Sequence, residues 1–139
     1  NCISVEDVIF LENRVSGVVI NWTAVRRLDM HVDPLMVCAK VVLDATGHPS
    51  EISRITAQKN NIRLNTESGS IMGEKSLSVD EGEKSTIDNT KEVYPGLFVS
   101  GMAANGVFGS FRMGPIFGGM LLSGKKAAEL IEKELKSNE

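Results

Sequence analysis

Three side chains of this sequence could carry out chemistry together: an imidazole, a carboxylate and a guanidinium that lie far apart along the chain. His48 follows an apolar run and a Thr-Gly pair, Asp33 precedes a proline, and Arg112 lies in a glycine-spaced stretch. An Asp oxygen and a His nitrogen would form an incomplete coordination sphere suited to Fe(II), Mn(II) or Zn(II), with open positions for a substrate. The planar fork of Arg112 suits a carboxylate or a phosphate.

Each of these residues also has a purely structural interpretation. His48 can be an acid or base, or simply a loop residue before a helix, and Asp33 can cap a turn. Arg112 can form a surface ion pair, but its glycine and apolar neighbours favour ligand binding. Met102 is expected in the core, and Cys38 is expected to pack as a strand residue without a base beside it.

Two apolar runs that end near glycine are predicted to position His48 and Arg112. They are residues 41–48 (VVLDATGH) and 96–103 (GLFVSGMA). In open α/β sheets, ligands bind beyond the carboxyl ends of the strands. We therefore expect both strands to open on one site, with a glycine-spaced loop after the second. A helix start beyond that loop would place backbone N–H groups where an anion can bind.

The other expected elements are read from periodicity and turn signals. Residues 5–12 and 15–22 predict a hairpin with a turn at Asn13-Arg14 and a bulge at Gly17. Residues 23–33 have helical spacing with weak caps. A single strand is expected over 35–45, a helix over 51–59 with Ser50 as its N-cap, and a polar surface excursion over 60–89. A last helix is expected from about Pro115 to about Lys136, with an apolar stripe through Ile116, Met120, Ala127 and Ile131. Within this helix, Gly118, Gly119 and Gly124 indicate close approach of another backbone or a ligand.

Composition narrows the class of protein. The chain has 139 residues, 42% of them hydrophobic, and a net charge of −3. One domain of ordinary size is expected, without the basic patch of a nucleic-acid-binding protein and without a membrane span. Cys2 and Cys38 fit no metal or redox spacing, which favours a reducing cytoplasm. The start without methionine leads us to expect part of a longer protein.

The two strand motifs resemble the C-terminal signatures of flavoproteins with two dinucleotide-binding motifs. The second of these signatures normally ends in Gly-Asp, and here Met102 takes the place of the aspartate that helps to hold the flavin. A fragment of an FAD-dependent oxidoreductase is therefore the alternative hypothesis, and Met102 argues against it. A non-catalytic interaction domain is a third.

A longer set of motifs closely resembles the thiazole synthases of the Thi4 type, in their archaeal, sulfide-dependent branch. The motifs are HVDP, DATGH, VYPGLFVSGMA and FRMGPIFGGMLLSGKKAAE, and the resemblance runs from about Val15 to Glu129, weakest across 60–89. It implies an α/β fold, with residues 1–139 as the C-terminal part of a Rossmann-like, FAD/NAD-binding domain that has a β-rich insertion. The N-terminal dinucleotide-binding βαβ unit is absent from this chain, which has no GxGxxG.

The resemblance also implies an activity, that of a transferase in thiamine biosynthesis. Such enzymes form adenosine diphosphate thiazole carboxylate from NAD, glycine and sulfide with Fe(II), and NAD is consumed as a substrate. They form homo-oligomeric rings, octamers among them, with sites shared between subunits. Because no cysteine lies in the motif of this chain, free sulfide and multiple turnovers are expected. The implied roles are NAD contacts for His31, Val32, Asp33 and Met102, glycine carboxylate binding for Arg112, and catalytic iron ligation for Asp33 and His48.

Overall fold

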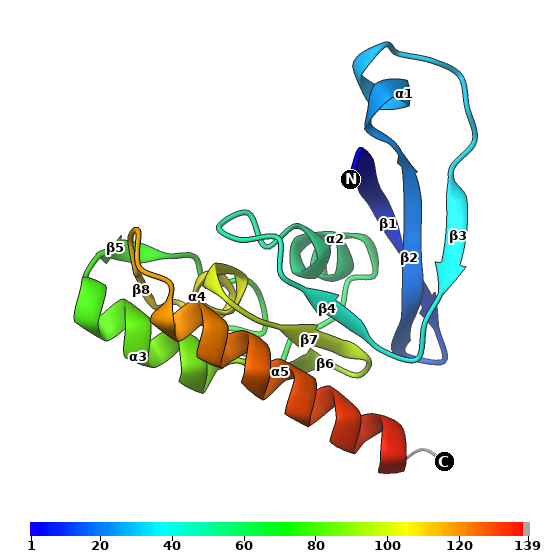
Figure 1. The fold of residues 1–139 in the computed structure, drawn as a ribbon. Helices are drawn as coiled ribbons and strands as arrows, with labels where there is room; N and C mark the ends of the chain where they lie inside the picture. The colour runs from blue at the N-terminus through cyan, green and yellow to red at the C-terminus, as the bar shows by residue number, and fades with distance from the viewer. Residues whose placement is uncertain (138–139) are drawn as a thin grey trace.

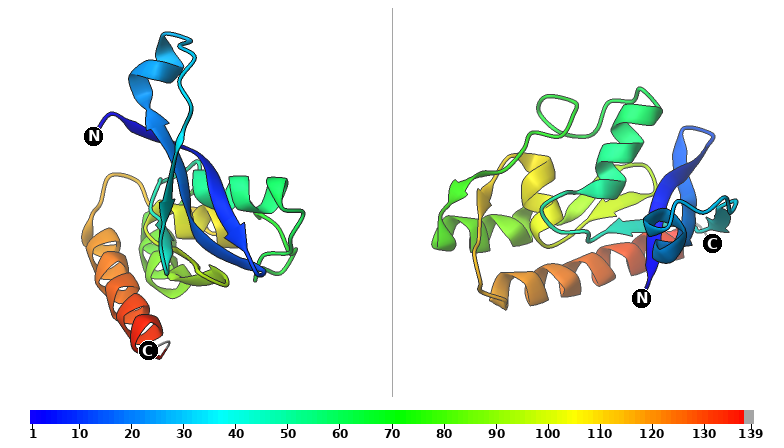
Figure 2. Two further views of the ribbon diagram at one scale, coloured as in Figure 1. Left: turned by 90° about the vertical axis from the view of Figure 1, so that its right-hand side faces the viewer. Right: turned by 90° about the horizontal axis from the view of Figure 1, so that it is seen from above.

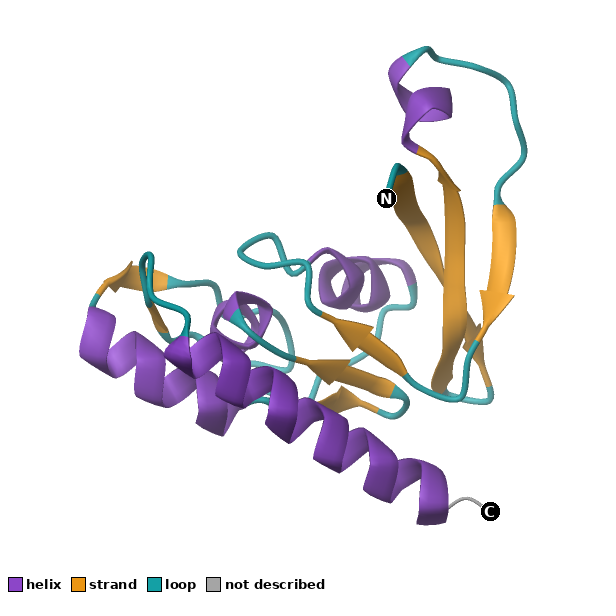
Figure 3. Ribbon diagram, viewed as in Figure 1, coloured by secondary structure: helices purple, strands orange, loops and turns teal. Residues whose placement is uncertain are grey.

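The computed structural model describes residues 1–137 and has a mixed α/β fold with three small sheets (Figures 1 and 3). An antiparallel sheet projects from one end as an arm, and the other elements form the body (Figure 2). The predicted α/β class is confirmed. The elements in chain order are β1 (Ile3–Leu11), β2 (Arg14–Trp22), α1 (Thr23–Arg27), β3 (Leu35–Cys38), β4 (Val42–Asp44), α2 (Glu51–Lys59), β5 (Lys75–Leu77), α3 (Val79–Asn89), β6 (Lys91–Tyr94), β7 (Leu97–Val99), α4 (Met102–Phe108), β8 (Phe111–Arg112) and α5 (Gly118–Ser137).

The arm is built on the predicted hairpin. β1 and β2 pair antiparallel around a turn at residues 12–13, one residue earlier than predicted, where both residues have positive φ as two-residue hairpins favour. The register shifts beside Gly17, as the predicted bulge requires. A β-carbon on Gly17 would lie 2.2 Å from the carbonyl oxygen of Val37, so glycine allows β3 to pair with β2 at this point.

The polar segment after β2 forms the end of the arm. Only its first part, α1, is helical, and residues 28–34 form a loop that returns to β3. The buried Asn21 holds this loop, because its side-chain nitrogen donates to the carbonyl oxygen of Val32 at 3.1 Å. In the middle of β1, Asp7 accepts a hydrogen bond from Lys59 at 2.6 Å, which joins the arm to the end of α2.

The expectation of one strand over residues 35–45 is wrong. β3 pairs with β2 in the arm, whereas β4 pairs parallel with β7 in the body. The chain changes sheets between them: the N–H of Ala39 still bonds to Ser16, and the N–H of Val42 already bonds to Gly96. Apart from Asp44, all residues of both strands are apolar, so the composition continues across a break that only tertiary pairing creates.

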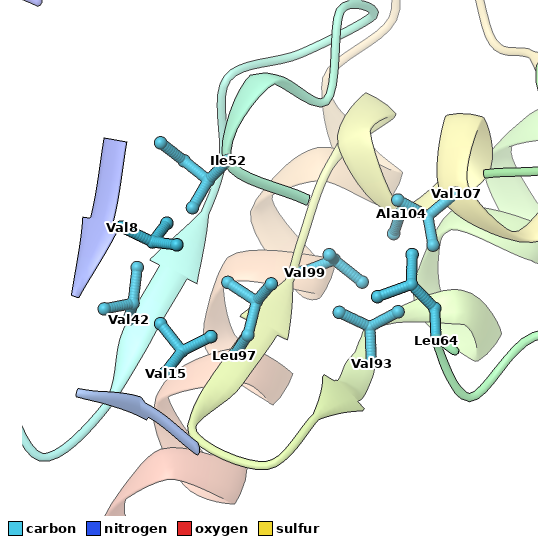
Figure 4. Packing of buried hydrophobic residues seen from close by; sticks show 10 residues of the cluster. All are labelled: Val8, Val15, Val42, Ile52, Leu64, Val93, Leu97, Val99, Ala104 and Val107. Carbon is cyan, nitrogen blue, oxygen red and sulfur yellow. The ribbon is translucent and has the colours of Figure 1, made fainter. Parts of the chain in front are cut away.

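The body is centred on the sheet β4-β7-β6, with α5 on one face and α2 and α4 on the other (Figures 1 and 2). Its core combines residues of this sheet with Val8 and Val15 of the arm (Figure 4). Val15, Val93, Leu97, Val99 and Val107 are fully buried. The arm and the body therefore share one hydrophobic core, which fixes the base of the arm.

Residues 60–89 are not only the polar surface excursion that was expected, because they contain β5 and the eleven-residue helix α3. α3 packs against α4 and α5. Its buried residues are Gly82 and Thr86, which give no apolar stripe. A β-carbon on Gly82 would lie 2.8 Å from the Met113 Cα and 2.9 Å from the carbonyl carbon of Arg112. The helix is thus positioned by close backbone approach rather than by large apolar side chains.

A fully buried asparagine fastens α3 to α4 and β8. The side-chain nitrogen of Asn105 lies within hydrogen-bond distance of the Gly82 carbonyl oxygen (3.0 Å), the Thr86 hydroxyl (2.8 Å) and the Phe111 carbonyl oxygen (3.0 Å). Its side-chain oxygen accepts a hydrogen bond from Asn89 at 3.0 Å. Because every polar atom of this side chain has a partner, its burial is compatible with stability.

The glycine-spaced loop expected after β7 is instead the short helix α4, bounded by Gly101 and by Gly109, whose φ of 72° ends the helix in the left-handed conformation. The last helix, α5, begins at Gly118 rather than Pro115. The Glu83 carboxylate accepts the N–H of Gly119 at 3.0 Å at this helix start.

The buried face of α5 differs from the predicted apolar stripe. Ala127 of that stripe is buried as predicted, together with Gly119 and Ser123, whereas Leu121 and Leu122 are exposed. Gly119 is in the predicted close contact, because a β-carbon there would lie 2.9 Å from Glu83, but Gly124 faces open space. No helix within residues 1–137 has the length and apolar character needed to cross a membrane.

Candidate functional site

The two predicted strand ends do meet at one edge of the body sheet. β4 and β7 are parallel neighbours, with Val42 beside Leu97 and Asp44 beside Val99. The N–H of Ser100 donates to the Asp44 carbonyl oxygen at 3.1 Å, so the pairing continues to the end of both strands. The loop over residues 45–49 and the start of α4 therefore leave the sheet side by side.

A buried carboxylate organises the loop that carries His48. Asp44 is fully buried, and its oxygens accept hydrogen bonds from the N–H and hydroxyl of Thr46 and from the N–H and hydroxyl of Ser53, at 2.7–3.1 Å. The Thr46 hydroxyl in turn accepts the N–H of Glu51 at 2.8 Å. Asp44 and Thr46 thus satisfy first-turn N–H groups of α2, which a capping side chain usually does.

The predicted boundaries of α2 are confirmed, and Ser50 does occupy the N-cap position, where its carbonyl oxygen accepts the N–H of Arg54 at 2.9 Å, but its hydroxyl does not cap the helix. Ser50 has a φ of 46°, its side chain makes no capping hydrogen bond, and its hydroxyl donates to the Ala103 carbonyl oxygen of α4 at 3.2 Å. A β-carbon on Gly106 would lie 2.8 Å from the Ser50 hydroxyl oxygen. The loop that carries His48 therefore rests directly on α4.

His48 and Arg112 converge on a carboxylate that was not predicted, Glu74. His48 Nδ1 lies 2.6 Å from Glu74 Oε1, and Arg112 Nε lies 3.9 Å from Glu74 Oε2. The side chains of His48 and Arg112 are about half exposed (48% and 52%), whereas that of Glu74 is 17% exposed. We call these three residues the His48–Glu74–Arg112 cluster. It presents an imidazole and a guanidinium to solvent above one shared carboxylate.

The backbone around Glu74 places the cluster beside α4 and β8. The N–H groups of Met72, Gly73 and Lys75 donate to the carbonyl oxygens of Val107, Gly106 and Ser110, at 2.9–3.1 Å. β5 then pairs parallel with β8, which carries Arg112. No motif or periodicity around Glu74 indicates a functional residue, because Glu74 lies in the polar segment for which a surface excursion is predicted.

The structure does not bring Asp33 to this cluster within one chain. His31, Val32 and Asp33 are all exposed on the loop at the far end of the arm, away from β5 and β8 (Figures 1 and 2). Asp33 and His48 were predicted to act together across a subunit boundary, and that prediction is unaffected. Among residues 1–137, no group of three or more His, Cys, Asp or Glu side chains is placed to hold a metal ion.

The donor set nevertheless fits a metal that takes only part of its ligands from one subunit. With Nδ1 of His48 facing Glu74, Nε2 is the ring nitrogen left for a metal, and an aspartate oxygen would complete a mixed N/O pair suited to Fe(II).

Met102, the first residue of α4, is only 5% exposed, as a core residue would be. Cys38 does lie in a strand, β3, but it is exposed, so the expectation that its side chain is packed is wrong.

The comparisons with known proteins agree on one family. A model described as the Thi4 family matches residues 1–117. The thiamine thiazole synthase of Methanothermobacter thermautotrophicus is 51% identical over 136 residues, covering 98% of this chain and 53% of that protein. That of Pyrococcus horikoshii is 50% identical, covering 99% of this chain and 52% of that protein. The similarity therefore includes the first residues, although the expected resemblance began only at about Val15.

A solved structure supports the same comparison. The crystal structure of Thermovibrio ammonificans THI4 superimposes with a TM-score of 0.94 and 51% sequence identity, covering 98% of this chain and 53% of that one. The chain thus spans about half the length of the relatives that it matches.

Proposed function

This chain belongs to the Thi4 family, and from that premise we propose that it forms the C-terminal, site-bearing part of an enzyme that makes the thiazole of thiamine. The proposed reaction forms adenosine diphosphate thiazole carboxylate from NAD, glycine and sulfide, with Fe(II) at the site and NAD consumed as a substrate. Family membership favours this proposal over an FAD-dependent oxidoreductase. The structural observation that carries it is the convergence of His48 and Arg112 on Glu74 beyond the ends of β4 and β7.

Arg112 is proposed to bind the glycine carboxylate. A guanidinium offers parallel N–H donors that match the two oxygens of a carboxylate. Arg112 lies at the end of β8 with its side chain half exposed, so the group can reach a ligand from solvent. The contact with Glu74 at 3.9 Å is longer than a direct hydrogen bond, which leaves donors of the fork available.

His48 and the Asp33 of a neighbouring subunit are proposed as the residues that would hold Fe(II). The metal, when bound, would supply a redox-capable Lewis acid. The loop with His31, Val32 and Asp33, together with Met102 at the start of α4, would contact NAD. This division of the site requires a homo-oligomer, because the arm holds its loop away from the cluster of its own chain. It also requires the dinucleotide-binding unit that the family resemblance places N-terminal to this region.

The test is an anaerobic incubation of the chain, alone and together with that dinucleotide-binding unit, with Fe(II), NAD, glycine and sulfide. The thiazole product is followed by mass. We expect several turnovers for each subunit, and a product limited to one for each subunit would contradict the use of free sulfide.

Two variants separate binding from folding. Arg112→Ala is expected to raise the KM for glycine while leaving the thermal unfolding midpoint close to that of the unmodified chain. Arg63→Ala, which removes an exposed arginine outside the cluster, is the matched control and is expected to leave KM unchanged. Equal effects of the two variants on the KM for glycine would refute the role of Arg112.

A further inference from the structure

Glu74 makes the shortest contact in the His48–Glu74–Arg112 cluster, and its two oxygens face different partners. Oε1 lies 2.6 Å from His48 Nδ1, and Oε2 lies 3.9 Å from Arg112 Nε. At 17% exposed, its side chain is the most buried of the three. A distance of 2.6 Å is typical of a short, charge-assisted hydrogen bond, whereas 3.9 Å allows only a longer-range ion pair. The strong interaction of Glu74 is therefore with the imidazole.

The surroundings of Glu74 fix where its carboxylate can lie. Residues on both sides of it bond to the backbone of α4 and of the turn that follows. A β-carbon on Gly106 would lie 3.7 Å from the Glu74 Cγ and 3.6 Å from the His48 carbonyl oxygen. The stem of Glu74 and the loop of His48 thus pass over the same small residue of α4. This close approach keeps the carboxylate beside the imidazole before any ligand binds.

The chemical consequence concerns the tautomer of His48. A neutral imidazole carries its proton on one nitrogen, and a hydrogen bond from that N–H decides which nitrogen keeps a free lone pair. A carboxylate only accepts hydrogen bonds, so Glu74 favours the proton on Nδ1 and leaves Nε2 as the ligand nitrogen. A metal-binding histidine held in this way by a carboxylate has its ring orientation and its basicity set by that partner.

We propose that Glu74 is a positioning residue that fixes the Nδ1–H tautomer of His48 and so presents Nε2 to the metal. The proposal rests on the proposed function, in which His48 is a metal ligand. The tautomer itself is a property of the chain without metal.

The first experiment is nitrogen NMR of the metal-free protein with labelled histidine. The chain has only two histidines, so His31→Gln assigns the signal of His48. We expect the Nδ1–H form to dominate. Glu74→Gln, whose amide oxygen can still accept from Nδ1, should retain this form, and Glu74→Ala should lose it. Glu67→Ala, an exposed acidic residue of the same segment, is the matched control and should change nothing.

The second experiment measures Fe(II) binding under anaerobic conditions in the assembled oligomer. Loss of such a carboxylate partner typically weakens metal affinity by about 10–100-fold, so Glu74→Ala should do so while Glu67→Ala should not. A dominant Nε2–H form in the unmodified protein would overturn the proposal, even if every Glu74 variant failed to fold. So would an unchanged tautomer or an unchanged Fe(II) affinity in Glu74→Ala. If the tautomer and the affinity respond as expected but no thiazole forms, the positioning role stands and the proposed function fails.

Discussion

Replacing Gly82 by alanine should destabilise the protein, although alanine is the better helix former. Gly82 is in α3, and a β-carbon there would lie 2.8 Å from the Met113 Cα and 2.9 Å from the carbonyl carbon and oxygen of Arg112. All three atoms belong to the backbone of β8 or of the residue after it. They cannot move aside by a rotamer change, as the end of a flexible side chain could.

Two opposing effects set the size of this change. Alanine in place of glycine within a helix gains about 1 kcal/mol of helix propensity. Overpacking a well-packed interior costs about 1–3 kcal/mol, and a contact with backbone belongs at the upper end of that range. The net expectation is a loss of about 2 kcal/mol in the free energy of unfolding, because the steric cost exceeds the gain in propensity.

Urea denaturation of the full chain measures this difference. Gly124→Ala is the matched control, because Gly124 also lies within a helix but faces open space. The control is expected to gain up to about 1 kcal/mol, as propensity alone predicts. If Gly82→Ala were stabilised by a similar amount, the close approach between α3 and β8 would not be a real constraint on this residue.

Three further substitutions test the other contacts. Asp44→Asn should lower the unfolding free energy by about 2–4 kcal/mol in thermal melts, because an amide cannot accept the hydrogen bonds of both Thr46 and Ser53; wild-type stability would contradict the anchoring role of Asp44. Asn105→Ala should cost a similar amount, about 2–4 kcal/mol, because buried carbonyl oxygens lose their donor, and a loss below about 1 kcal/mol in urea would refute this. Burial alone would raise the pKa of Asp7, but the hydrogen bonds from Lys59 and from a backbone N–H, with the Lys59 charge, hold it below its ordinary value of 3.8. Because its folded-state pKa is lowered, Asp7 stabilises the fold at pH values above its ordinary pKa, and this stabilisation is lost as the pH falls through the folded-state pKa. Asp7→Asn should therefore lower the free energy of unfolding by less than about 1 kcal/mol at neutral pH and should not change it in acid. A difference between the two proteins that grew in acid would contradict this sign.

The parts of the fold that local patterns specify could be predicted from the sequence. Two β-rich runs joined by a turn signal predicted the hairpin, and α2 has the predicted bounds. The shared edge of β4 and β7 followed from two apolar runs that end near glycine. These signals are local, and each lies within a few residues of the element that it specifies.

The missed elements depend on contacts between distant segments. The change of sheet between β3 and β4 leaves no mark in the composition, because both strands suit β structure. α3 was missed because it buries a glycine and a threonine beside Asn105 rather than an apolar stripe. Glu74 was missed for the same reason: its importance lies in its two partners, which are distant in sequence, and a polar segment gives no sign of them.

The arm separates Asp33 from His48 of the same chain, and this separation has a genetic consequence. If each site takes Asp33 from one subunit and His48 from the next, subunits with Asp33→Ala and subunits with His48→Ala are both inactive by themselves. In a random one-to-one mixture of the two, about a quarter of the sites would be intact, because an intact site forms only where a subunit with Asp33 meets a subunit with His48 in the required order. Two defective copies in one cell could then rescue each other, and a single chain bearing both lesions could rescue neither.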